Sequence, residues 1–265
     1  YSKMRFWSTE FILKEFVKLL DYGVRTIRIV DEMFLLNPKY YIPLCEKLAE
    51  RNKDDTLRIW SYSRIDTVKR PEILKMVRDA GIKWLCLGIE SGDKKVRLEV
   101  AKGKFEDVDV KTVVNKIHEA DIEVLGNYIF GLPTDTHETM KETYNLSCEL
   151  DTEYVNYYCA MAYPGSQLHR DAMANNSEAL PENNGIGWIG YSQHSYECFP
   201  LATDELPNWE IVKFRDQAFI NYFNEKSYVD KTTTKFGPKF KEQINNMLAA
   251  TNNKPLKRKI VVENS

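Results

Sequence analysis

The regular alternation of helical segments with short apolar segments constrains the fold of this chain more than any other feature. Five segments are predicted strands, namely residues 24–30, 57–61, 82–89, 122–130 and 154–162, and the third of them is continuously apolar. Amphipathic segments with helix signals separate them, and Asn37-Pro38, for example, is typical of an N-cap followed by a first-turn proline. Because parallel strands need long crossover connections, this order predicts an α/β fold with a parallel sheet covered by helices.

Two parallel architectures stay open at this point, a (β/α) barrel and an open doubly wound sheet. No G-x-G-x-x-G follows the first apolar segment, which weakens the interpretation as a dinucleotide-binding sheet. The chain begins with a helical segment and offers five strand segments before Pro164, whereas a standard barrel closes with eight strands. We therefore expect either a partial barrel that lacks an upstream strand or a domain that simply begins with a helix.

The pattern changes in the last third of the chain. Residues 175–207 are rich in asparagine, glycine and aromatic residues, which predicts a packed irregular loop. Helices are expected at 207–225 and near 238–250. The chain is therefore divided into a barrel core over residues 1–175 and a loop with a C-terminal helical extension over residues 176–265.

Composition excludes several classes of protein. The 265 residues carry 37 Lys and Arg against 39 Asp and Glu, so no strong positive field attracts nucleic acid. The basic run Lys257-Arg258-Lys259 is expected in a frayed, solvated tail. No apolar run approaches the ~20 residues of a membrane span. A signal peptide is not expected, because residues 1–11 contain no apolar h-region. The five scattered cysteines lack C-x-x-C spacing, which favours reduced thiols in a cytoplasmic protein.

Polar and glycine-rich groups follow the apolar segments. They are Asp31-Glu32, Ser63-Arg64, Glu90-Ser91-Gly92, Gly131-Leu132-Pro133 and Tyr163-Pro164-Gly165-Ser166. Because ligands bind beyond the carboxyl ends of parallel strands, these groups predict one site for a zwitterionic or hydroxyl-bearing ligand. Arg64 suits a carboxylate and Glu90 suits hydroxyl or ammonium donors. Each group also has a purely structural interpretation, as a cap or a tight turn.

Other catalytic and metal-binding patterns do not occur in the sequence. The four histidines show neither H-x-x-x-H nor H-E-x-x-H spacing, so a zinc site is not expected. Neither a G-x-S-x-G elbow nor a P-loop is present. Cys86 and Cys159 lie in predicted strands and Cys45 and Cys148 in predicted helices, and the cysteines are interpreted as structural.

Five motifs occur in an order that resembles a known family. They are Val30-Asp31-Glu32-Met33-Phe34, Ser63-Arg64-Ile65-Asp66 and the segments 87–92, 126–133 and 163–166. With them the chain resembles the radical S-adenosylmethionine (SAM) superfamily, and most of all the branch that often carries an N-terminal cobalamin-binding domain, such as the anaerobic magnesium-protoporphyrin ester cyclases. The segments 200–201, 214–219, 236–237 and 256–259 extend the resemblance into the C-terminal helical region.

The resemblance implies a partial, TIM-like barrel of six β/α units, of which the first strand is missing here, followed by a C-terminal helical region. It also implies that SAM lies across the strand ends. Carried over to this sequence, Asp31 or Glu32 contacts the amino group of SAM. Arg64 lies near the methionyl carboxylate, and Ser63 belongs to the same motif.

The later motifs are implied to bind the nucleoside part of SAM. Glu90 faces the ribose, and Ser91 belongs to the same motif. Ile129 and Gly131 belong to the motif that packs against the adenine. Three consecutive residues line the other side of the adenine: Ala160, Met161 and Ala162.

The sequence departs from the family at the C-x-x-x-C-x-x-C loop, whose three thiolates bind a [4Fe–4S] cluster in the family, because no such motif occurs here. The chain is therefore expected to begin just after that loop, to have no metal ligands and to be inactive by itself. In the parent enzyme, an electron donor would reduce the cluster, and the cluster would pass the electron to SAM. SAM would then split into methionine and a 5′-deoxyadenosyl radical that abstracts hydrogen from a small-molecule substrate. Cobalamin from an upstream domain would add methyl transfer or ring-forming oxidation.

Two other functions stay open from the sequence. One is a cluster-free (β/α) barrel lyase that uses strand-end carboxylates. The other is a non-catalytic interaction module that pairs through a sheet edge. The aromatic loop over residues 188–199 is either a substrate lid or a packed connection to the C-terminal helices.

Overall fold

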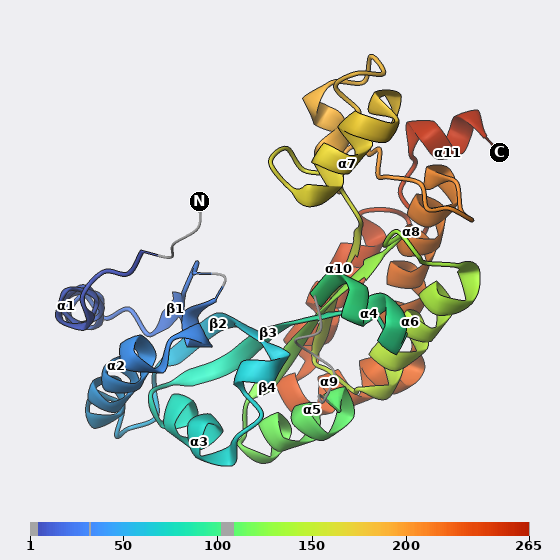
Figure 1. The fold of residues 1–265 in the computed structure, drawn as a ribbon. Coiled ribbons are helices and arrows are strands. Elements are labelled where there is room, and N and C mark those ends of the chain that lie inside the picture. Colours follow the sequence, from blue (N-terminus) through green and yellow to red (C-terminus); the bar gives the residue numbers. More distant parts are fainter. Residues whose placement is uncertain (1–4, 32, 102–108, 265) are drawn as a thin grey trace. The chain divides into compact units, whose positions relative to one another are not determined.

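The computed structural model describes residues 5–31, 33–101 and 109–264 (Figure 1). Within these residues, five strands form one sheet in the order β1-β2-β3-β4-β5. Their bounds are Thr26–Arg28 (β1), Arg58–Arg64 (β2), Ile82–Glu90 (β3), Glu123–Phe130 (β4) and Tyr154–Cys159 (β5). β2 pairs in parallel with β1 and with β3. The predicted α/β fold with a parallel sheet is confirmed.

Helices alternate with the strands and follow the last one. Those before β5 are α1 (Thr9–Asp21), α2 (Pro38–Arg51), α3 (Pro71–Asp79), α4 (Lys94–Ala101), α5 (Val110–Glu119) and α6 (His137–Glu149). Those after it are α7 (Gln167–Asn175), α8 (Asn208–Asn224), α9 (Lys226–Phe236), α10 (Pro238–Ala249) and α11 (Lys259–Glu263). The described part of the chain contains no helix with both the length and the hydrophobicity that a membrane crossing requires.

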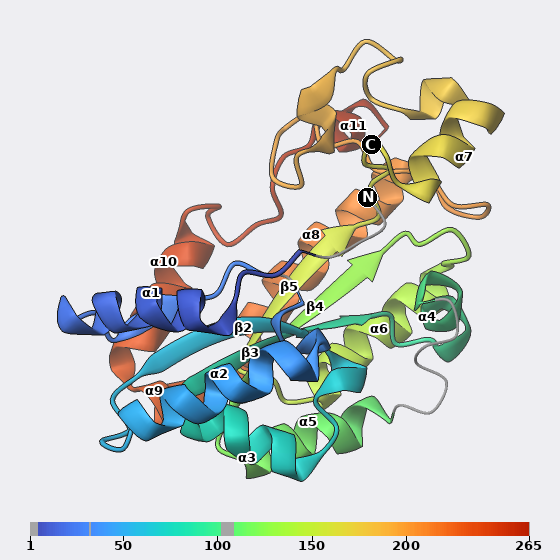
Figure 2. The same ribbon diagram turned by 60° about the vertical axis from the view of Figure 1, so that its left-hand side comes forward.

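The described residues form two compact units. The first takes its residues from 1–89, 104–127 and 152–154. In this unit α2, α3 and α5 lie along one face of β2 and β3 (Figure 2). Fully buried leucines such as Leu44 and Leu85 form the core between these layers. The crossover helices therefore cover this face of the sheet, as the apolar strands require.

The second unit takes its residues from 90–103, 128–151 and 155–265. Its core includes Phe130 of β4 and Ile211 of α8, both fully buried. The ring centroids of Phe130 and Phe214 lie 5.1 Å apart in an edge-to-face arrangement, which favours packing of α8 on the strand. The division of the chain at residue 175 stays a prediction.

The end of the chain differs from the sequence-based expectation. Arg258 is only 1% exposed, although the sequence predicts a frayed tail. Its Nε donates a hydrogen bond to Asp216 Oδ2 at 2.7 Å, and its Nη1 donates to the carbonyl of Ser195 at 2.6 Å. This buried ion pair ties the C-terminal segment to α8, so the prediction of a frayed, solvated tail is wrong for Arg258, whereas Lys257 and Lys259 are exposed. Helix α9, between the two predicted C-terminal helices, was also not expected.

Candidate functional site

The carboxyl end of β2 presents Ser63 and Arg64 in different ways. Arg64 donates two hydrogen bonds to Asp66, at 2.9 and 2.8 Å, and its side chain is 20% exposed. The pairing with Asp66 orients the guanidinium. The Ser63 side chain is nearly buried, and its hydroxyl lies 2.8 Å from the Thr67 hydroxyl. Ser63 therefore stabilises the turn after the strand.

Asp31 follows β1 and has a local structural role. Its Oδ1 accepts a hydrogen bond from the backbone N–H of Met33 at 2.8 Å, which forms an Asx turn. This is the capping role that the sequence also allows for Asp31. Glu32, the alternative contact for the amino group, lies outside the described residues.

Glu90 is the last residue of β3 and combines two unfavourable features. Its φ of +69° lies in the left-handed region, which costs a non-glycine residue about 1–2 kcal/mol. Burial raises the pKa of its carboxyl from 4.5 to about 7. No group among the described residues hydrogen-bonds to this carboxyl. Glu90 is partly buried, and a carboxyl with a raised pKa and no donors from the described residues is a candidate to receive donors from a ligand.

The loop after Glu90 is fixed to α6. The hydroxyl of Ser91 lies 3.2 Å from the Thr143 hydroxyl, and the N–H of Gly92 donates to the same oxygen at 2.8 Å. A Cβ atom on Gly92 would lie 2.6 Å from the Glu142 carbonyl oxygen, so this close approach requires glycine. The Ser91 hydroxyl thus serves packing on α6. Sequence reasoning missed Thr143, because nothing distinguishes a threonine within a helix from its neighbours.

The carboxyl end of β4 forms an apolar surface with β5. Val96, Leu132 and Ala160 make one buried cluster, and Ile129 packs against it. The predicted adenine contacts Ile129 and Ala160 are therefore brought together. Gly131 has a φ of +77°, and a Cβ there would lie 2.6 Å from Cγ2 of Ile211 on α8.

Asp135 holds the turn after β4 in place, a role that sequence reasoning did not assign. Its side chain is buried, with Oδ2 accepting from the N–H of Leu132 at 3.0 Å and Oδ1 from the Thr139 hydroxyl at 2.7 Å. Burial raises the pKa of Asp135 despite these hydrogen bonds. These hydrogen bonds hold the glycine-leucine-proline turn in its observed conformation.

The three residues after β5 lie outside the strand but are buried. Ala160, Met161 and Ala162 are buried, at 4%, 6% and 3% exposure. The N–H of Ala160 donates to the carbonyl of Phe130 at 2.9 Å, and its carbonyl accepts from Leu201 at 3.3 Å. Of the predicted site residues, the first unit thus holds Asp31, Ser63 and Arg64, and the second unit holds the rest apart from Glu32.

The cysteines do not fit an iron–sulfur cluster, which needs thiolate ligands. Burial raises the pKa of the thiols of Cys45, Cys86 and Cys159 to about 12, and it also raises the pKa of Cys148 and Cys198. Within residues 5–31, 33–101 and 109–264, no group of three His, Cys, Asp or Glu side chains is arranged to hold a metal ion. The described residues therefore provide no cluster site.

Sequence comparison places these features in a family. Residues 1–147 match the family described as the radical SAM superfamily. The chain is 28% identical over 179 residues to an uncharacterised methyltransferase of Pyrococcus horikoshii, which covers 66% of this chain and 38% of the relative. It is also 28% identical over 178 residues to the anaerobic magnesium-protoporphyrin IX monomethyl ester cyclase of Cereibacter sphaeroides, which covers 64% of this chain and 29% of the relative. The chain thus spans well under half the length of these relatives.

Solved structures share the fold. A radical S-adenosylmethionine methyltransferase from Kitasatospora setae, solved with cobalamin and a [4Fe-4S] cluster bound, has a TM-score of 0.51 at 20% identity over 57% of this chain and 29% of that chain. A cobalamin-dependent S-adenosylmethionine radical enzyme has a TM-score of 0.52 at 14% identity over 93% of this chain and 41% of that chain. The predicted partial barrel with a C-terminal helical region is confirmed. Because the family match covers more than half of its residues, the chain belongs to the radical SAM superfamily.

Proposed function

We propose that this chain forms the SAM-binding part of a radical SAM enzyme that acts on a small molecule, by methyl transfer or by an oxidative, ring-forming reaction. The names of two relatives, a methyltransferase and a cyclase, support these two reaction types. The cobalamin-bound structures of similar fold support cobalamin as a second cofactor, held by another part of the parent protein. An electron donor and a cytoplasmic location complete the proposal, and the five free cysteines support that location.

Glu90 carries the proposal. When bound, SAM would supply the 5′-deoxyadenosyl group that this family uses as a radical source. The ribose of that group has two hydroxyls, and a carboxylate accepts two hydrogen bonds from such a pair. Glu90 has this acceptor capacity, lacks partners among the described residues and lies on a strained backbone. A ligand that donates to Glu90 would offset the cost of its burial.

The family resemblance assigns other residues to the two ends of SAM. Ile129 and Ala160 offer an apolar surface that suits the adenine ring. Arg64, held in one orientation by Asp66, would pair with the methionyl carboxylate. Asp31 would contact the amino group with the oxygen that does not form the Asx turn.

Calorimetric titration with S-adenosylhomocysteine tests this proposal without any cluster. The folded chain is expected to bind it, and Glu90→Gln is expected to weaken binding about tenfold or more, because a hydrogen bond to a charged group is lost. Glu119→Gln, on the exposed face of α5, is the matched control and should bind as the unchanged protein does. The proposal would be contradicted if Glu90→Gln bound S-adenosylhomocysteine as tightly as the unchanged protein does, or if the folded unchanged protein did not bind it.

A further inference from the structure

A cavity of about 120 Å³ lies in the second unit, between α8 and the segment that precedes α11. Apolar side chains form much of its wall, among them Tyr158, Phe219 and Leu256. An engineered apolar cavity of about 150 Å³ binds benzene. This cavity therefore has the size for one small ring rather than for a nucleotide.

Three buried charged residues line the same cavity. Arg215, Asp216 and Arg258 are 2%, 6% and 1% exposed. Asp216 Oδ1 lies 2.6 Å from Nε of Arg215, while Asp216 Oδ2 accepts from Nε of Arg258 at 2.7 Å. One carboxylate thus faces two guanidinium groups, which leaves one positive charge in excess. The adjacent thiols of Cys159 and Cys198 do not balance it, because burial raises the pKa of both.

A buried charge in excess is costly unless an anion accompanies it. Two further cationic or hydrogen-bonding side chains, His194 and Lys254, line the cavity. Both are exposed, and neither makes a side-chain hydrogen bond or ion pair with any residue in the described part of the chain. They are therefore available to a ligand, and Lys254 adds a second positive charge at the entrance.

We propose that this cavity binds a small monocarboxylate with an aromatic body. The ring would lie among Tyr158, Phe219 and Leu256, and the carboxylate would face Lys254 and the arginine pair. A single negative charge matches the single excess charge of the buried cluster, and the apolar wall favours a ring over a purely inorganic anion. The site involves none of the residues proposed for SAM, so it stands independently of that proposal.

Benzoate is the probe, and benzamide is its neutral counterpart of the same shape. Ligand-observed NMR titration is expected to give saturable benzoate binding with a Kd of ~1 mM or tighter. Benzamide should bind about tenfold more weakly, because it lacks the charge. Equal binding of the two compounds, or no benzoate binding, would overturn the proposal. Inorganic phosphate binding more tightly than benzoate would also overturn it, because the ring would then contribute nothing.

Two lysine variants locate the site. Lys254→Met should weaken benzoate binding about fivefold or more while leaving benzamide binding and the melting temperature unchanged, because Lys254 is exposed. Lys257→Met is the matched control, since Lys257 is also exposed and does not line the cavity. An equal loss in both variants would show a general charge effect and contradict the assigned site.

Discussion

At the residue scale, Glu90 is costly for folding and useful for binding. The pKa of its carboxyl is raised in the folded state, so the folded protein binds this proton more tightly than the unfolded chain. The stability of the unchanged protein therefore falls as pH rises from about 4.5 to about 7, and the loss is complete above pH 7. The shift corresponds to roughly 3 kcal/mol.

The charge on Glu90 can be removed by substitution in the SAM-free protein. Glu90→Gln is expected to raise the free energy of unfolding by up to about 3 kcal/mol at pH 8, and to change it little at pH 4. Glutamine keeps the shape and the left-handed backbone, so the difference isolates the charge. Urea unfolding at both pH values measures it. A variant less stable than the unchanged protein at pH 8 would mean that the carboxylate is well solvated or paired.

The same residue controls the pH dependence of ligand binding. Hydroxyl donors from a bound ribose lower the pKa of the carboxyl, so binding releases a proton when the pH is below about 7. The affinity for S-adenosylhomocysteine is therefore expected to fall by up to about tenfold per pH unit below pH 7. Calorimetry in buffers of different ionisation enthalpy counts the protons released. No proton release at pH 6 would contradict the role given to Glu90.

Part of this site can be read from the sequence. The apolar run before Glu90 predicts a strand that ends there, and β3 does end at Glu90. Its positive φ cannot be predicted, because glutamate has no preference for that region and tertiary packing imposes it. The contact of Ser91 with Thr143 joins residues 52 positions apart, and local sequence carries no record of such a pair.

At the element scale, Gly131 determines how closely α8 approaches β4. Gly131→Ala would place a methyl group 2.6 Å from Ile211 Cγ2 on a backbone with φ of +77°. The expected loss of stability is about 2–4 kcal/mol, from strain and overpacking together. Gly185→Ala is the control, because Gly185 has a φ of +84° but no atom within 4 Å of the added methyl. Gly185→Ala should lower the free energy of unfolding only through backbone strain, by about 1 kcal/mol.

The double variant separates these two causes. Ile211→Ala removes the side chain that collides, so Gly131→Ala should cost less in that background than in the unchanged protein. Chemical unfolding of the four proteins measures the coupling. Additive losses would show that α8 already moves away from the added methyl.

Helix starts were predictable where a side chain caps them. The side chain of Asn37 accepts a hydrogen bond from the N–H of Lys39 at 3.2 Å. Helix α2 begins at the residue after Asn37, as the sequence indicates. Helix α9 has no such signal, because Glu225 makes no side-chain cap and three threonines weaken its helix propensity. Its position depends on packing that only the folded chain reveals.

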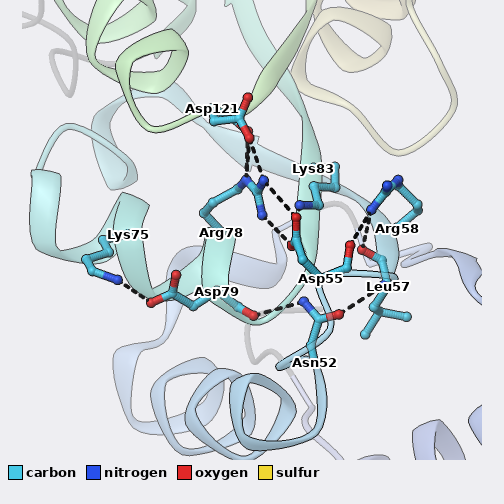
Figure 3. A network of polar contacts seen from close by, with 9 residues as sticks. All are labelled: Asn52, Asp55, Leu57, Arg58, Lys75, Arg78, Asp79, Lys83 and Asp121. Atoms are coloured by element: carbon cyan, nitrogen blue, oxygen red, sulfur yellow. Dashed lines mark hydrogen bonds and ion pairs between the residues drawn. The ribbon is translucent and has the colours of Figure 1, made fainter.

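At the scale of the whole molecule, ion pairs join segments that are distant in sequence. Figure 3 shows Arg78 of α3 reaching Asp55 and Asp121, which precede β2 and β4. Arg78 Nη1 lies 2.8 Å from Asp55 Oδ1, and Lys83 Nζ lies 2.5 Å from the same oxygen. Hydrogen bonds from Arg78, and to a smaller extent from Lys83, hold the pKa of Asp55 well below its usual range.

A lowered pKa means that this stabilisation is present above about pH 4 and is lost as the pH falls. Arg78→Met is expected to lower the free energy of unfolding by about 1–2 kcal/mol at pH 7. This value is small for an ion pair because the Asp55 side chain is 53% exposed. The loss should be smaller still below pH 4 or in 1 M salt. Lys75→Met, which removes an exposed pair with Asp79 on the same helix, should cost under about 0.5 kcal/mol. Equal losses would show that the Arg78 contacts contribute no more than an ordinary surface pair.

The C-terminal segment is held by a pair that the sequence cannot show, since Arg258 and Asp216 are 42 residues apart. Asp216→Leu leaves two buried guanidinium groups without a counter-charge, whereas Arg258→Met leaves the Arg215–Asp216 pair intact. We therefore expect Asp216→Leu to cost about 4 kcal/mol and Arg258→Met about 2–3 kcal/mol, with Lys257→Met within about 0.5 kcal/mol of the unchanged protein. Urea unfolding measures all three. If Arg258→Met behaved like Lys257→Met, the C-terminal segment would not be docked by this pair.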